Sequence, residues 1–274
     1  MKTLKESILK SVKAGRHGIL LFPKDNNELK RMILDEIKKQ EHEKVIDLNH
    51  IQLEEIRDMS FAFSNLKGFK FDVSRWDTSK VVDMAYLMSG SDIEIDISGW
   101  KTGSVKDFSA AFQDSTFNGD ISGWNTSEAR WMSSMFSGNK HFNQNINNWN
   151  VEKVLTMHDM FKGSIFNQPL NNWKIKNCRD MDEMFMSSQF DQDISDWDVS
   201  NVGSMNSMFA FSIFNKDLAK WKPKSVSDMK SMFAYSEYRF SLSSWEVKKT
   251  CQIKGIFTDT PFDKKTKEYP KRVL

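Results

Sequence analysis

The stretch FDQDISDWDVSNVGSMNSMFAFS, residues 190–212, recurs in altered form along most of the chain. Its tryptophan is one of eight that follow one another at a constant interval, except that the step from Trp124 to Trp149 is a single residue longer: Trp76, Trp100, Trp124, Trp149, Trp173, Trp197, Trp221 and Trp245. A fixed period of 24 residues is typical of solenoids. In a solenoid each unit stacks on copies of itself, because no unit can bury its apolar side alone. The sequence therefore predicts an α/β repeat solenoid.

Other apolar residues keep step with the tryptophan, which we take as position 0 of each unit. Position −3 is Ile, Leu or Val, position −7 is mostly Phe, and positions +5, +8 and +12 are mostly Val, Met and Phe. A residue type repeated at every unit in phase with other apolar columns is typical of a core, because exposed rows of this size would promote aggregation. We therefore expect the tryptophans to be buried instead of forming a stacking platform for sugars or bases.

The spacing of the apolar residues within a unit changes from two to three and four. Positions 0 and +2 alternate as on a strand, whereas +5, +8, +11 and +12 fit one face of a helix. Ser79, Ser127 and Ser200 occupy +3, where a helix would need an N-cap. We expect one short strand and one short helix per unit, with the extra residue between Phe136 and Phe142 looped out in a turn.

The repeat pattern divides the chain into three segments. Met59, Ala62 and Phe63 continue the pattern around Ile51, so residues 45–262 hold about nine units, and at a usual spacing of about 4.8 Å the stack is about 40 Å long. Residues 1–44 are expected to be a cap that covers one open end of the stack. Residues 263–274 form a basic tail that is expected to fray.

The cap has its own pattern of helices and strands. Helical spacing of apolar residues predicts helices over Thr3 to Lys13 and Asn27 to Lys39, and short apolar runs predict strands at Gly18 to Phe22 and Val45 to Leu48. The expected order is α-β-α-β.

The repeated phrase strongly resembles the BspA-like leucine-rich repeat proteins, in the short-repeat branch found in mycoplasma-type lipoproteins. The resemblance rests on Phe190 to Val202 and Met205 to Phe209, and in its several copies it covers about three-quarters of the chain. It implies a leucine-rich-repeat-like, right-handed stack of coils that binds other macromolecules. It implies no reaction, because the residues shared with the family are the buried columns.

Composition argues against several classes of partner. The net charge is +2, and the repeats are mildly acidic between basic ends, unlike a nucleic-acid-binding protein with its basic face. Mean hydropathy is −0.56, and no apolar run is long enough to span a membrane. Residues 1–10 lack the apolar core and cleavage site of a signal peptide, so a cytoplasmic or phage-associated location is favoured, although the related proteins are often at the cell surface.

Motifs for catalysis and for metal or cofactor binding are not found. The five histidines lack metal-ligand spacing, and no nucleophile elbow, P-loop or dinucleotide-binding motif occurs. Cys178 and Cys251 lie three units apart, too far for a disulfide, and are expected to be buried thiols. Asp and Asn at positions −4 and −6 resemble Ca²⁺ ligands, but the glycine-rich spacing of calcium repeats is absent, so we expect turn residues and no metal.

Aromatic residues outside the buried columns are the best candidates for a binding site. Phe211 and Tyr235 both occupy +14 of adjacent units, so they should be neighbours on the surface, with Met186 at +13 of the preceding unit; Trp131 is the one tryptophan out of phase. Large side chains of this kind dominate protein interfaces. We expect a protein–protein interaction scaffold of bacterial or phage origin, with a carbohydrate-binding or adhesin-type module as the alternative.

Overall fold

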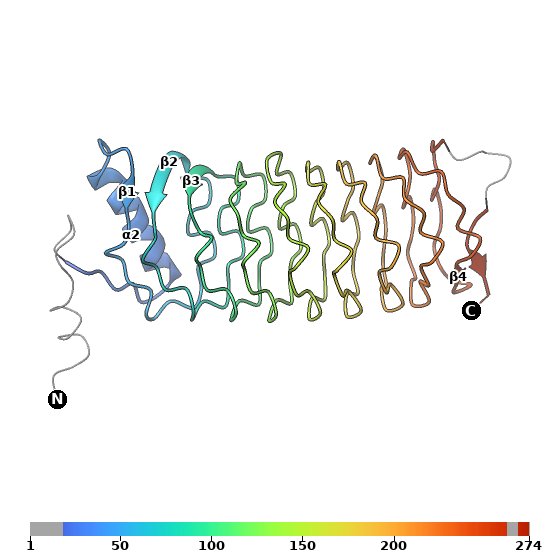
Figure 1. Cartoon of the computed structure of the whole chain (residues 1–274), viewed down its shortest axis with the longest axis horizontal. Coiled ribbons are helices and arrows are strands. Elements are labelled where there is room, and N and C mark those ends of the chain that lie inside the picture. Colours follow the sequence, from blue (N-terminus) through green and yellow to red (C-terminus); the bar gives the residue numbers. More distant parts are fainter. Residues whose placement is uncertain (1–18, 262–267, 274) are drawn as a thin grey trace, which may run out of the picture.

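The computed structural model describes residues 19–261 and 268–273, and this part of the chain forms one row of stacked coils (Figure 1). Each coil is one repeat. Neighbouring coils are joined at position +7 by parallel backbone bridges that run from Asp58 through Asp83 and Asp107 to Gln252. The repeats predicted from the tryptophan spacing are therefore present as tandem coils, one for each unit of the pattern.

Most coils consist of turns, so the expectation of a short strand and a short helix in every repeat is wrong. Between Asp96 and Trp245 the structure contains no α-helix and no strand longer than a single bridge. One turn closes with the N–H of position 0 donating to the carbonyl of −3, and a second with the N–H of +5 donating to the carbonyl of +2 in most coils, as in Trp100 to Ile97 and Val105 to Thr102. A turn brings its first and fourth residues together, and the apolar spacing of three comes from that geometry.

The segment predicted as a helix is a run of overlapping turns. In one coil the N–H groups of Leu87, Ser89 and Ser91 donate to carbonyls three residues earlier, whereas those of Met84 and Tyr86 donate to the next coil. Positions +10 and +14 have positive φ in all nine coils, which ends any helix after a few residues. The N-caps expected at Ser79, Ser127 and Ser200 are also absent. Instead, their N–H groups donate to the Asp or Asn side chain at +1.

The predicted apolar columns form the core. The tryptophans at position 0 are at most 7% exposed, and the rings of five of the seven successive pairs stack, with Trp173 and Trp197 at a centroid distance of 6.4 Å. Seven of the eight indole N–H groups donate to the carbonyl of position −3 in the preceding coil, as Trp124 does to Ile97 at 3.1 Å. The Trp100 Nε1 has no partner. The columns thus tie each coil to the one before it.

The extra residue between Phe136 and Phe142 is looped out as expected. Asn139 is fully buried at this point, and its Oδ1 accepts from the N–H groups of His141 and Phe142 at 2.8 and 2.9 Å. Phe142 still stacks on Phe136, with ring centroids 4.0 Å apart. The insertion therefore leaves the aromatic columns intact.

The N-terminal end of the row is covered by helix α2, Asn26–Lys39, which Asp25 caps by accepting from the Glu28 N–H at 2.8 Å. Its side chains supply hydrogen bonds that a preceding coil would otherwise make: the Asn26 Nδ2 donates to the Ser60 carbonyl at 2.7 Å. This predicted helix is confirmed. It has 14 residues, and no helix in the described ranges is long and apolar enough to cross a membrane.

Three short parallel strands follow in the order β1 (Ile46–Asp47), β2 (Lys67–Asp72) and β3 (Asp92–Ile95). Gln40 closes the outer edge of β1, because its side-chain amide both donates to and accepts from the Asp47 backbone. The strand expected at Gly18 to Phe22 is reduced to one bridge between Leu21 and Ile51. The helix expected at Thr3 to Lys13 lies outside the described residues.

The tail is ordered where the structure describes it, which corrects the expected fraying. Strand β5 (Lys271–Arg272) pairs in parallel with β4 (Glu246–Val247) at the C-terminal end of the row. Pro270 is buried one repeat length after Trp245, in phase with the tryptophans. The end of the chain therefore continues the repeat.

Candidate functional site

The side of the coils that carries positions +7 to +14 forms one continuous surface, which we call the turn face. The N–H groups at +8, +10, +12 and +14 of most coils donate to the next coil. The side chains at +8 and +12 point into the core, whereas those at +7, +9, +10, +13 and +14 reach the surface in most coils. Side chains at equal positions therefore form rows along the molecule.

Phe211 and Tyr235 are in contact on this surface, as the sequence predicted. Their rings are parallel, with centroids 4.8 Å apart, and the residues are 53% and 50% exposed. Both have positive φ, 58° and 57°, a conformation that is rare for bulky residues. Three other coils have glycine at this position, where the backbone is unstrained. Both residues of this exposed aromatic pair thus adopt a backbone conformation that is unfavourable for bulky side chains.

A second aromatic pair, which the sequence analysis missed in part, lies near the N-terminal end. Phe61 and Tyr86 stack with centroids 4.6 Å apart, and both are exposed at position +10 with positive φ. The Lys30 Nζ of α2 lies 5.9 Å from the Phe61 ring centroid. The signal for this contact in the sequence was that both residues occupy position +10. Phe61 lies in the coil that lacks the tryptophan, where the repeat pattern is weakest.

Of the other two predicted site residues, Trp131 lies apart from the Phe211 pair and Met186 lies in the adjacent coil. Trp131 is 40% exposed, but it occupies +7 in a coil three steps away. Met186 is half-buried at +13 in the coil before Phe211, and its carbonyl accepts from the Gly163 N–H. No ring contact joins Trp131 to another described residue. Of the predicted residues, Phe211 and Tyr235 form a ring contact, Met186 lies in the coil beside them, and Trp131 lies three coils away.

Aromatic side chains are concentrated on the turn face. Within the described ranges the exposed aromatic side chains are Phe61, Tyr86, Trp131, Phe211, Tyr235 and Tyr269. The first five belong to the turn face, and Tyr269 follows the last coil. Exposed aromatic residues in one region mark interaction sites more often than scattered ones do.

The turn face is also acidic, and in the first three coils its aspartates form a column. Asp58, Asp83 and Asp107 follow one another at +7, and each accepts the N–H two residues later, at 2.7 to 2.8 Å. Burial raises the pKa of Asp83, and the neighbouring charges of Asp107 and Asp58 raise it further. Like charges thus lie one above another.

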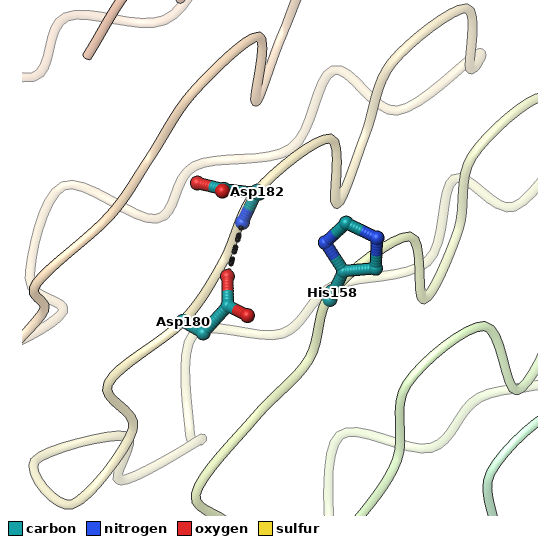
Figure 2. Close-up of side chains that lie close together, drawn as sticks. All are labelled: His158, Asp180 and Asp182. Atoms are coloured by element: carbon teal, nitrogen blue, oxygen red, sulfur yellow. Dashed lines mark hydrogen bonds between the residues drawn. The ribbon is translucent and has the colours of Figure 1, made fainter. Parts of the chain in front are cut away.

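His158, Asp180 and Asp182 form a small cluster from two adjacent coils (Figure 2), with potential ligand atoms within 4.8 Å of one another. The Asp180 Oδ1 accepts from the Asp182 N–H at 3.0 Å, and the Asp182 Oδ1 accepts from Ser204 and from the Asn206 N–H. Burial raises the pKa of Asp182, which the Asp180 charge raises further. The carboxylates are thus engaged in holding turns.

The Asp and Asn columns outside the turn face also form hydrogen bonds with the backbone. At −4 the Oδ1 accepts the N–H two residues later, as Asp96 does from Ser98 at 3.0 Å. At −6 the side chains of Asn118, Asn143, Asn167 and Asp191 accept from the N–H of the same position in the next coil, in a ladder that ends at Asn215. The contacts at −4 match the turn role expected for these columns, whereas those at −6 join neighbouring coils.

Neither cysteine is placed to react. Cys178 and Cys251 are free and buried, and burial raises the pKa of the Cys178 thiol to about 12. A surface hollow of about 590 Å³ lies beside β2 and β3, and its lining includes an exposed ion pair between Lys70 and Glu94. These features leave the turn face as the candidate site.

Comparison with known proteins gives one result. A family model described as "Mycoplasma protein of unknown function, DUF285" matches four overlapping stretches of the chain, residues 28–130, 91–189, 115–213 and 166–269. The matches together span most of the chain and overlap as expected for tandem repeats. No curated protein and no solved structure matches the chain.

Proposed function

We propose that this chain, which belongs to the family described as "Mycoplasma protein of unknown function, DUF285", is a protein-interaction scaffold whose turn face binds another protein. The observation that carries the proposal is the gathering of Phe61, Tyr86, Trp131, Phe211 and Tyr235 on one face, while the other coil surfaces are mostly polar. Exposed aromatic side chains supply most of the energy of many protein interfaces.

The proposal includes a solenoid of the leucine-rich-repeat-like, right-handed kind, related to the BspA-like proteins. Its support is the row of coils joined by parallel bridges and the match of the family model to overlapping repeats. Such stacks offer long surfaces because each unit touches only its neighbours. An origin in bacteria or phage fits the same relationship.

The proposed function is non-enzymatic. The acidic residues of the turn face hold turns, and the thiols are buried. Nucleic acid is a poor partner, because its phosphates would meet acidic side chains.

The strain at Phe211 and Tyr235 supports a binding role for this pair. A bulky residue with positive φ costs stability, on the order of 1 kcal/mol or more. Gly90, Gly138 and Gly163 occupy the same position +14 without that cost. Phe211 and Tyr235 occupy a position that suits glycine, and their exposed side chains have no role in the core. A contact with a partner would give these aromatic residues a function.

The test is binding by the double variant Phe211→Gly/Tyr235→Gly, which restores the residue that other coils have at +14. We expect affinity for a protein partner, isolated by capture on the whole chain, to fall at least tenfold, while thermal stability stays unchanged or rises. Leu34→Gln, which changes an exposed apolar residue of α2, is the control and should leave affinity unchanged. Equal binding by the double variant and the parent would contradict the proposal.

Carbohydrate binding is the second candidate, favoured by the exposed aromatic rings beside polar turns. A glycan array probed with the whole chain distinguishes the two. Glycan binding that is lost in Phe211→Gly/Tyr235→Gly would replace the protein partner with a sugar.

A further inference from the structure

Charge is distributed unevenly over the molecule, and the turn face is its acidic side. Positions +7 to +14 of the nine coils contain ten acidic residues and three lysines, a formal charge of −7. Because the whole chain carries +2, the residues outside this face carry +9. The acidic residues are Asp58, Asp83, Asp107, Asp114, Asp159, Asp180, Asp182, Glu183, Asp228 and Asp259.

Few of these charges are neutralised from within the chain. Lys162 pairs with Asp159 and Glu183, and Lys230 pairs with Asp228. Among the described residues, no lysine or arginine forms an ion pair with the other seven acidic residues. The stacked aspartates at +7 therefore repel one another, and like charges opposite each other on neighbouring strands destabilise a sheet. A basic partner would remove this repulsion on binding.

The aromatic residues fit the same kind of partner. The exposed ring of Phe61 already has a cation, Lys30, near its face at 5.9 Å from the centroid. A lysine or arginine over an aromatic ring is stabilised by the negative charge density of the ring face. The rings of Tyr86, Trp131, Phe211 and Tyr235 offer further sites for such contacts and for apolar side chains.

The dimensions of the surface set the length of the partner segment. The two aromatic pairs lie in the first and second coils and in the seventh and eighth coils. At about 4.8 Å per coil, the distance from the first to the eighth coil is about 34 Å. An extended segment of about ten residues would span it.

From these observations we propose that the turn face binds a basic protein segment, about ten residues long, in which lysine or arginine alternates with apolar residues. The proposal rests on the proposed function, and it names the chemistry of the partner. The basic side chains lie over the aspartates and aromatic rings, and the apolar side chains contact Phe211 and Tyr235. The acidic charge of this face disfavours nucleic acids and anionic lipid surfaces as occupants.

The test uses fluorescence anisotropy with the whole chain and three labelled peptides of about twelve residues. In these peptides leucine alternates with arginine, glutamine or glutamate. We expect the arginine peptide to bind at least about tenfold more tightly than the glutamine peptide, and the glutamate peptide to bind least. The affinity of the arginine peptide should fall as salt is added, because salt screens exposed charges. Equal affinity for the arginine and glutamine peptides would overturn the proposal.

Two matched variants test the position of the site. Asp58→Asn/Asp83→Asn/Asp107→Asn removes three charges from the turn face, and the control Asp96→Asn/Asp120→Asn/Asp193→Asn removes three elsewhere. All six aspartates accept the N–H two residues later, which asparagine can also do. We expect the first variant to lose about tenfold in affinity for the arginine peptide and the control less than about twofold. Equal losses would contradict the site.

A display library of peptides without charge bias separates failure of this inference from failure of the proposed function. Neutral or acidic peptides that bind the parent but not Phe211→Gly/Tyr235→Gly would overturn the basic partner and keep the protein-interaction function. Glycan binding with no peptide bound would overturn both. Enrichment of basic peptides that lose affinity in the Asp58, Asp83 and Asp107 variant would support both.

Discussion

Single residues with positive φ determine the path of the backbone in each coil. They recur at +10 and +14, where most residues are glycine, asparagine, aspartate or serine, and the others are Ala110, Glu183 and the exposed aromatic residues. Glycine, asparagine and aspartate adopt this conformation at low cost, and other residues do so at a cost of about 1 kcal/mol. Aromatic residues at these positions therefore stand out against the requirements of the fold.

This backbone pattern predicts opposite effects for two neighbouring serine substitutions. Ser134 has a φ of 56°, whereas Ser137, which is equally half-buried, does not have positive φ. Ser134→Gly should raise the free energy of unfolding by about 0.5–1 kcal/mol, because it relieves strain. Ser137→Gly should lower it by a similar amount, because glycine adds entropy to the unfolded chain. Denaturant unfolding measures both, and destabilisation by Ser134→Gly would contradict the assignment.

The Asp83 charge predicts a pH-dependent effect on stability. Because the folded pKa of Asp83 is raised, the fold favours its neutral form, and stability is lost as pH rises through that pKa. Asp83→Asn should therefore raise the Tm by about 1–2 °C at neutral pH and have little effect in acid, below the pKa of an ordinary aspartate.

Asp96→Asn is the control with the opposite sign. The Ser98 N–H holds the pKa of Asp96 below its ordinary value, so its charge stabilises the fold above the ordinary pKa, and this contribution is lost in acid. This variant should lower the Tm at neutral pH, and the difference should disappear at low pH. Thermal scans of both variants across pH measure the two trends, and trends of the same sign would contradict the pKa directions.

At the scale of elements, the sequence predicted which residues are buried better than it predicted their local structure. The columns of Trp, Met and Phe are in the core, and the looped-out residue is at its predicted place. The sequence pattern does not distinguish a helix from a series of turns, because both bring residues three apart to one side. The predicted helix is therefore replaced by turns. Glycine and asparagine at +14 are compatible with a helix that ends there, and the positive φ at +10 has no such signal, because glycine occupies that position only at Gly255.

The candidate site was predictable to the same partial extent. Equal repeat positions predicted the contact between Phe211 and Tyr235, which the structure contains. The face shared with Phe61 and the acidic column was not predicted, although +7 and +10 are three residues apart and would share one side of a helix as well. The outward direction of +7, +9 and +10 follows from the turns.

Helix α2 acts as the cap of the first coil, which gives a prediction for one hydrogen bond. The Asn26 Nδ2 donates to the Ser60 carbonyl and hydroxyl, whereas the neighbouring Asn27 is exposed. Asn26→Ala should lower stability by about 1 kcal/mol, because it leaves a carbonyl of the first coil without its donor. Asn27→Ala should have less effect. Hydrogen exchange of residues 58–65 should accelerate in the first variant only, and equal rates in both would contradict the capping role.

The whole molecule is a row of coils with a different surface on each side. Its acidic turn face carries the exposed aromatic residues, and its remaining surfaces carry the positive charge. Such segregation favours a partner that runs along the coils, because a row of repeats presents the same position many times. The central claim is that binding takes place on this face.

Carboxyl labelling with a carbodiimide, read by mass spectrometry, tests that claim most directly. The labelling rates of the acidic residues are compared in the free chain and with the arginine–leucine peptide or a captured protein partner bound. On the turn face, labelling of Asp58, Asp107, Asp114 and Glu183 should fall severalfold on binding, whereas labelling of the exposed Asp77, Asp96 and Asp120 should stay unchanged. Protection of the second group, or uniform labelling of both groups with the partner bound, would contradict the account.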